Sequence, residues 1–146
     1  MQPYILFLHI LSATIWTGGH LILATVILPK VLKTGDVDGL MAFEKNYEKI
    51  GMPALLIQII TGFYLVYSIV PDVSQWLSFS DFNTTRIGIK ISLLIVNILF
   101  ALSAKFFVIP KLRKKTLPLM AFHIISVTLI GIAFVFIGSS FKNDLF

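Results

Sequence analysis

Three histidines and one lysine interrupt long apolar stretches of the sequence. His9 and His20 lie in the first stretch. Lys90 lies in the third stretch and His123 in the fourth. Ionisable side chains at membrane depth are costly, and they usually mark functional sites. A neutral imidazole is a good ligand for iron and copper, so these residues are the first candidates for cofactor or metal binding.

Helical spacing places His9, Trp16 and His20 on one face of a single helix. Together with Ala13 they follow an i, i+4, i+7, i+11 pattern. Eleven residues at 1.5 Å each separate the two imidazoles by roughly 16 Å along the helix axis. They cannot ligate one ion together, so this face presents one site near each side of the membrane.

The depth of each residue in its span selects its partner. Counted from the span midpoints, His20 and His123 each lie roughly 6–8 Å toward the inner side. Lys90 matches the depth of His9 on the outer side to within about one turn. We therefore expect two pairs, His20 with His123 inside and His9 with Lys90 outside.

The inner pair predicts a bound haem. Two neutral imidazoles on facing helices can ligate a haem iron axially, one on each side of the porphyrin plane. An interhelical hydrogen bond and a copper site are the alternatives for this pair. At the outer pair, Lys90 could hold a haem propionate, a quinone or another anionic group, or extend to the outer interface. His9 could relay protons, provide a second ligand site or form a hydrogen bond.

The other ligand types are few. The sequence has no cysteine, which excludes disulfides, thiolate metal sites and c-type haem attachment. None of the four methionines is expected beside a histidine at mid-membrane, and this argues against a copper path. Small residues near the histidines leave room either for a flat macrocycle or for a close neighbouring helix. These residues are Ser12, Ala13, Gly18, Gly19, Ala24 and Gly131. Interhelical hydrogen bonds are expected from Gln58, Thr61, Tyr64 and Asn97.

The elements that position these residues are membrane-spanning helices. Of the 146 residues 57% are hydrophobic, and the mean hydropathy is +0.92. A soluble domain of this size cannot bury so much apolar surface. Four stretches suit spans of roughly 20 residues, at about 4–28, 52–70, 87–109 and 117–139. We expect one all-α domain, a four-helix membrane bundle without a cleaved signal peptide and without an internal repeat.

The charge distribution predicts the topology. Basic residues follow the first span and cluster where the third span ends, whereas the stretch VPDVSQWLSFSDFNTT after the second span has Asp72 and Asp81 and no lysine or arginine. By the positive-inside rule both basic loops are cytoplasmic and both termini lie outside. The net charge of +5 therefore reflects topology, and we expect no nucleic-acid partner. The expected location is the inner (plasma) membrane of a bacterium, and the sequence leaves a homo-oligomer open.

The loop between the first two spans is expected to contain a short interfacial helix. The segment DVDGLMAFEKNYEKI has apolar residues at near-helical spacing, and Asp36 or Asp38 could cap its start. Its lysines would face anionic headgroups. A simple connector is the alternative.

Short motifs in the first three spans follow the order found in a known family. The first span reads His9-x6-Trp16-x-Gly18-Gly19, the second has Met52-Pro53-Ala54 followed by Gly62, and the third has Lys90. With these motifs the chain resembles the HemJ-type membrane protoporphyrinogen oxidases and the related CopD-like copper-resistance membrane domains. The resemblance runs over all four spans. It implies a four-helix membrane bundle, haem b in the HemJ branch and copper handling in the CopD branch, and it assigns site roles to His9, Trp16 and Lys90.

The fourth span departs from the HemJ-like pattern. In place of an Asn-Glu-hydrophobic-Pro stretch this chain reads AFHIISV, with His123 near the acidic position. The histidine often present in the third span of that family is replaced near Ala101, and His20 lies outside the pattern. These departures disfavour protoporphyrinogen oxidation.

We therefore expect a b-type haem protein with haem between His20 and His123. A low-spin, six-coordinate iron suits electron transfer with a membrane quinol or a redox partner protein. The alternatives are a CopD-like copper transport or resistance protein, a HemJ-like oxidase with Lys90 on the substrate carboxylates, and an assembly subunit of a larger membrane complex.

Overall fold

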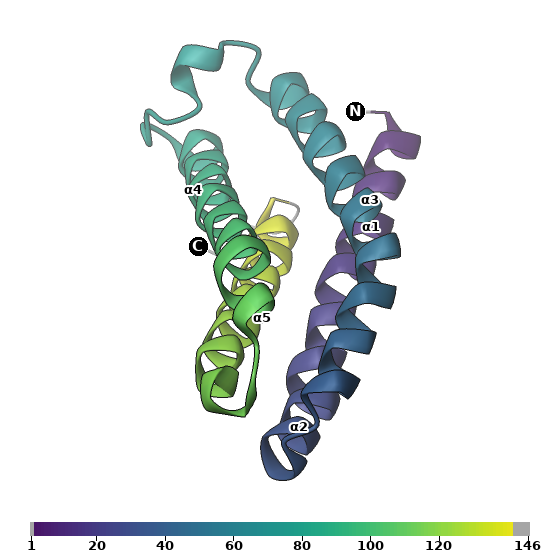
Figure 1. The fold of residues 1–146 in the computed structure, drawn as a ribbon. Coiled ribbons are helices and arrows are strands. Elements are labelled where there is room, and N and C mark those ends of the chain that lie inside the picture. Colours follow the sequence, from purple (N-terminus) through teal and green to yellow (C-terminus); the bar gives the residue numbers. More distant parts are fainter. Residues whose placement is uncertain (1, 142–146) are drawn as a thin grey trace.

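Long helices make up most of the chain in the computed structural model, which describes residues 2–141 (Figure 1). The helices are α1 (Pro3–Ile22), α2 (Leu28–Thr34), α3 (Val37–Ile69), α4 (Phe82–Ser103) and α5 (Leu117–Ser140). Short π or 3-10 segments connect them at Leu23–Ile27, Val73–Gln75, Ala104–Val108, Ile109–Lys111 and Lys114–Thr116. No strand forms among the described residues, so the all-α prediction is confirmed.

Four helical stretches are long and apolar enough to cross a membrane. They are Pro3–Thr34, Val37–Ile69, Phe82–Lys111 and Lys114–Ser140, and each overlaps one predicted span. The largest extensions lie at the end of the molecule where α1 connects to α3 and α4 connects to α5. We name this the inner end, because the sequence predicts it to be cytoplasmic. The opposite end, with the 3-10 turn Val73–Gln75, is the outer end.

The expected interfacial helix is continuous with the second spanning helix. Asp36 caps the start of α3, where its Oδ1 accepts a hydrogen bond of 2.9 Å from the Gly39 N–H. From Val37 the helix runs without a break to Ile69 and accommodates Pro53 in its interior. Residues of the predicted loop therefore lie on the same rigid helix as the second span.

The helices form two hairpins, α1 with α3 and α4 with α5 (Figure 1). α1 also packs along α5, so the order across the molecule is α3, α1, α5, α4. In Figure 1, the loop with the 3-10 turn joins α3 and α4 at the outer end. The main contact between the two hairpins is that of α1 with α5.

The two hairpins share one irregularity at matching positions. α1 passes into the five-residue π turn Leu23–Ile27, and α4 passes into the π turn Ala104–Val108. Pro29 and Pro110 follow these turns, so the turns and the prolines are each 81 residues apart (23 and 104, 29 and 110). Because proline has no N–H, a helix must adjust its hydrogen bonds before it, and a π turn is one such adjustment.

The second helices of the hairpins also match. Pro53 precedes the sequence QIIT in α3, and Pro118 precedes HIIS in α5, with both pairs 65 residues apart (53 and 118, 58 and 123). The inner connection of the first hairpin is longer than that of the second, so the two helices match at different offsets. These matches are short, and the expectation that the chain has no internal repeat stays a prediction.

Two clusters of buried apolar residues form the core. The larger cluster lies at the inner end and contains Leu23, Leu28, Val31, Leu40, Val108, Leu117, Met120, Ala121 and Ile124. The smaller one consists of Trp16, Leu55 and Val127, with Ile59 and Phe100 packed against it. Residues of both clusters border the cavity described next.

Candidate cofactor site

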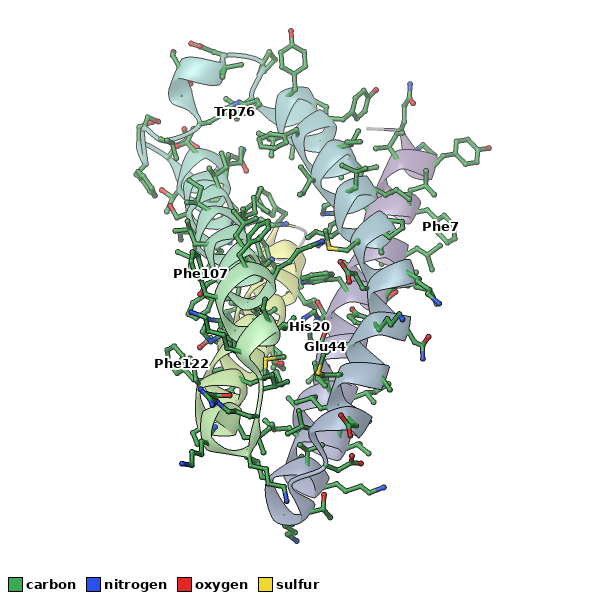
Figure 2. The ribbon with its side chains drawn as sticks, in the orientation of Figure 1. Phe7, His20, Glu44, Trp76, Phe107 and Phe122 are labelled. Atoms are coloured by element: carbon green, nitrogen blue, oxygen red, sulfur yellow. The ribbon has the colours of Figure 1, made fainter. Side chains whose placement is uncertain are left out.

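A cavity of about 380 Å³ lies between the hairpins in the inner half of the bundle. His20 on α1 and His123 on α5 both line it, together with Trp16. In Figure 2, His20 and Glu44 lie between the hairpins, whereas Phe107 and Phe122 project away from the bundle. The volume lies within the range of roughly 300–1,000 Å³ that is usual for small-molecule sites.

His20 is oriented by the backbone of its own helix. Its Nδ1 lies 3.0 Å from the carbonyl oxygen of Trp16, which can only accept a hydrogen bond. The neutral ring therefore has its proton on Nδ1 and its lone pair on Nε2. The ring packs against the indole of Trp16, with centroids 4.4 Å apart. Metal-binding histidines commonly have this arrangement, with Nδ1–H fixed by a carbonyl and Nε2 left for the ligand.

Tyr47 joins α3 to α1 beside His20. Its hydroxyl donates a hydrogen bond of 2.8 Å to the carbonyl oxygen of Trp16, and its ring meets the imidazole edge-on with centroids 5.5 Å apart. A Cβ at Gly19 would collide with the Tyr47 ring, so only glycine permits this approach. Gly19 therefore serves helix packing, not a macrocycle.

Other small residues near the site also serve packing. A Cβ at Gly131 would lie 3.1 Å from Oγ1 of Thr17, and one at Gly62 would lie 3.1 Å from Cε1 of His9. A Cβ at Gly18 would meet nothing within 4 Å. Of the two interpretations that the sequence left open, close helix packing explains Gly19 and Gly131.

His123 is buried, with 6% of its surface exposed, and both ring nitrogens are engaged. Nδ1 lies 2.9 Å from the carbonyl oxygen of Leu119, so Nδ1 again has the proton. Nε2 accepts a hydrogen bond of 3.0 Å from the hydroxyl of Ser103 on α4. A ligand at Nε2 of His123 must therefore displace the Ser103 hydroxyl.

His20 and His123 line the cavity at different heights. The Thr128 hydroxyl lies 3.1 Å from the backbone oxygen of His20, which sets these two residues level across the α1–α5 interface. His123 lies five residues further in along α5, or about 7.5 Å. Side chains lean toward the N-terminus of their own helix, which is the outer end for α1 and the inner end for α5. The structure therefore brings both imidazoles to one cavity but does not place them face to face.

The outer pair lies away from the cavity. His9 donates from Nδ1 to the backbone oxygen of Gln58 at 3.1 Å, and the same nitrogen lies 3.0 Å from the Thr61 hydroxyl. The ammonium group of Lys90 lies 3.5 Å from the position of a Cβ at Gly138 and 5.8 Å from the Phe141 ring. His9 is thus held within the α1–α3 interface, and Lys90 lies beside α5.

Other polar residues differ from their expected roles. Thr61 has a hydrogen bond across the α1–α3 interface as expected. The Asn97 amide is 1% exposed, yet neither it nor Oε1 of Gln58 has a hydrogen-bond partner among the described residues. Tyr64 is 44% exposed on α3. The expected interhelical hydrogen bonds of Asn97, Gln58 Oε1 and Tyr64 are therefore not formed.

Three methionines border the cavity. Met41, Met52 and Met120 all line it with the two histidines. The continuous helix α3 brings Met41 of the predicted loop to the cavity wall, whereas the expectation that no methionine pairs with a histidine at mid-membrane stays a prediction. Within residues 2–141, no three His, Cys, Asp or Glu side chains come together as a metal site.

Sequence reasoning missed Tyr47 and Ser103, the neighbours that fix the two imidazoles. Tyr47 belongs to the predicted interfacial helix, and that prediction does not bring its ring to α1. A glycine in the middle of a spanning helix can indicate that a bulky side chain packs against it. Gly19 is such a glycine, and the side chain is that of Tyr47. Ser103 gives no comparable signal, because small polar residues are common in spanning helices.

Comparison with known proteins gives no match to any family model, curated protein or solved structure. The resemblance to HemJ-type and CopD-like proteins therefore stays a prediction from short motifs. The cavity and its two histidines provide the physical basis for a functional proposal.

Proposed function

We propose that the protein binds a b-type haem in the cavity between the hairpins and takes part in membrane electron transfer. His20 is the principal ligand in this proposal. One observation supports it most directly. The Trp16 carbonyl oxygen accepts a hydrogen bond from Nδ1–H of His20, which lines the cavity, so the lone pair on Nε2 is left for a ligand. A haem with imidazole ligands exchanges single electrons, and its potential depends on burial and on the axial ligands.

His123 is the second ligand in this proposal. Its Nε2 becomes available when the Ser103 hydroxyl turns to a carbonyl of its own helix, a bond that serines in helices commonly form. Because the two histidines differ in height, ligation by both requires the His123 ring to turn outward along α5. We therefore expect His20 to retain haem alone and His123 to determine the spin state.

The proposed topology places the cavity in the cytoplasmic half of the membrane. The lysines at the inner end are the basis of this assignment, and both termini are then outside. The first part of α3 would lie at the inner interface, with its lysines near anionic headgroups. We propose the bacterial inner membrane as the location, and a quinol or a soluble redox protein as the electron partner.

Visible spectroscopy of the purified protein tests the haem proposal. We expect a Soret band that sharpens and shifts on reduction with dithionite. His20→Ala should lose the haem, whereas His123→Ala should retain it and change from low spin to high spin. Gly18→Ala is the control, because a Cβ at this position meets nothing. If both histidine variants kept a low-spin spectrum and His9→Ala lost it, the assignment of the site would be wrong.

A copper site is the second candidate, and the three cavity methionines favour it. Thioether and imidazole groups together suit Cu(I). His20, His123, Met41, Met52 and Met120 line the same cavity. Elemental analysis distinguishes the candidates: copper in a colourless protein from haem-replete cells would overturn the haem proposal and support the copper site.

A further inference from the structure

A basic hollow adjoins the cavity. Lys45, Glu48, Lys49, Met52, Pro53 and Lys105 line this second hollow. Four of these residues also line the cavity itself: Lys45, Glu48, Met52 and Lys105. The basic hollow therefore adjoins the apolar cavity, and we name it the mouth of the cavity.

The mouth has an excess of positive charge. Glu48 is its one carboxylate, and it forms an ion pair of 2.9 Å with Lys105, with each side chain about half exposed. Lys45 and Lys49 form no ion pair with any other described residue. With Glu44 on the adjoining cavity wall counted as well, three ammonium groups face two carboxylates, so one positive charge is left for a further anion.

The Glu48–Lys105 pair also spans the opening. Glu48 lies on α3 and Lys105 lies in the π turn after α4. The ion pair therefore links the two hairpins at the cavity wall. An exposed pair of this kind contributes little stability, and a ligand anion can replace Glu48 as the partner of Lys105.

We propose that Lys45, Lys49 and Lys105 bind the carboxylate groups of the cavity ligand. This inference rests on the proposed haem function, in which these groups are the haem propionates. The apolar ring then lies in the cavity and the two carboxylates lie at the mouth, where the ammonium groups and water solvate them. The ligand is therefore an amphiphile with acidic groups on one edge.

This assignment differs from the expectation that Lys90 holds a propionate. Lys90 lies next to Gly138, which is fifteen residues from His123 along α5. That separation is about 22 Å along the helix axis. Lys45 and Lys105 instead line the cavity with both histidines, and Lys49 lines the adjoining hollow, so all three are nearer to a ligand bound there.

Titration with hemin and with hemin dimethyl ester tests the inference, because the ester has no free carboxylates. The variant is Lys45→Gln/Lys49→Gln/Lys105→Gln in a neutral detergent, and binding is followed by the Soret band. We expect its affinity for hemin to fall roughly tenfold, since each half-exposed pair contributes modestly. Affinity for the ester should be equal in both proteins, which also shows that the cavity of the variant is intact.

Two further variants sharpen the test. Glu48→Gln removes the competing carboxylate and should tighten hemin binding about threefold without affecting the ester. Lys33→Gln, on α2 outside both hollows, is the matched control and should bind hemin as the wild type does.

The outcomes separate this inference from the proposed function. If the wild type and the triple variant bound hemin equally, the mouth lysines would have no such role while haem binding would stand. If neither hemin nor its ester bound to the wild type, the proposed function itself would fail, and this inference with it.

Discussion

The two hairpins have the same backbone plan but different side chains at the positions that matter. Each has a π turn and a proline at the inner end of its first helix. At matched positions His20 corresponds to Ala101, and Gln58 corresponds to His123. Each hairpin thus contributes one imidazole, from its first helix in one case and from its second helix in the other. This exchange explains why the two rings lie at different heights.

The same comparison separates packing from chemistry. The position that matches Gly19 in the second hairpin is Phe100. Gly19 admits the Tyr47 ring, whereas Phe100 packs against the cluster of Trp16, Leu55 and Val127. One hairpin receives an aromatic ring from its partner helix and the other provides one. A repeated frame therefore supports two different interiors.

The largest effect is expected from moving an imidazole between the hairpins. Ala101 lines the cavity, and it lies two residues from Ser103, which contacts His123. A histidine at position 101 can donate from Nδ1 to the carbonyl of Asn97, as His20 does to Trp16. We therefore expect Ala101→His to restore haem to His20→Ala, with a low-spin spectrum, because the new ring lies nearer in height to His123.

The single variant His20→Ala is the comparison for this experiment, and absorbance at the Soret band is the measurement. If the double variant folded with native helix content but stayed without haem, the hairpins would not be equivalent at the cofactor site.

A smaller effect is expected from the two adjacent glycines of α1. Gly19→Ala forces a methyl group against the Tyr47 ring and should destabilise the protein by about 1–3 kcal/mol. Gly18→Ala meets no atom and should stabilise it by up to about 1 kcal/mol through helix propensity. Denaturant unfolding in detergent measures both. In a Tyr47→Ala background the two substitutions should become similar, and equal costs in the wild type would contradict the proposed contact.

The smallest effect concerns how the first helix of each hairpin begins. α4 starts at Asp81, whose carboxylate accepts hydrogen bonds from the backbone of Thr84 and Asn83, whereas α1 has no side-chain cap. The backbone hydrogen bond from Thr84 is the main cause that lowers the pKa of Asp81. A lowered pKa stabilises the fold above the usual pKa of aspartate, and this contribution is lost as the pH falls below about 4.

Thermal unfolding followed by circular dichroism tests this effect between pH 6 and pH 3. The wild type should lose more thermal stability on acidification than Asp81→Asn, which has no charge to lose. Identical pH profiles would show that the cap does not contribute.

The sequence predicts the spanning helices well and their lateral arrangement poorly. Length and hydropathy determine that Pro3–Thr34 can cross a membrane, because each span must satisfy its own backbone hydrogen bonds. Counting residues from the midpoint of each span gives the depth of each side chain, and this count places His20 and His123 in the same half of the bundle. It did not reveal their difference in height, because the relative shift of α1 and α5 depends on contacts such as Thr128 with His20.

The largest difference between the sequence prediction and the structure concerns the residues of the predicted loop between the first two spans. Whether the chain after Asp36 forms a separate helix or extends α3 depends on packing against α1, which local periodicity does not encode. That one difference moved Met41, Glu44 and Tyr47 from a connector to the wall of the cavity.

The position of Trp16 also allows ligand binding in the cavity to be followed by tryptophan fluorescence. The chain has two tryptophans. Trp16 lines the cavity, whereas Trp76 belongs to the outer loop and stacks on Phe63, with centroids 5.8 Å apart (Figure 2). Replacing Trp76 by phenylalanine would leave one indole, 4.4 Å from the imidazole of His20. The fluorescence of that indole would then report occupancy of the cavity, and quenching would reveal a bound ligand with no change to the site.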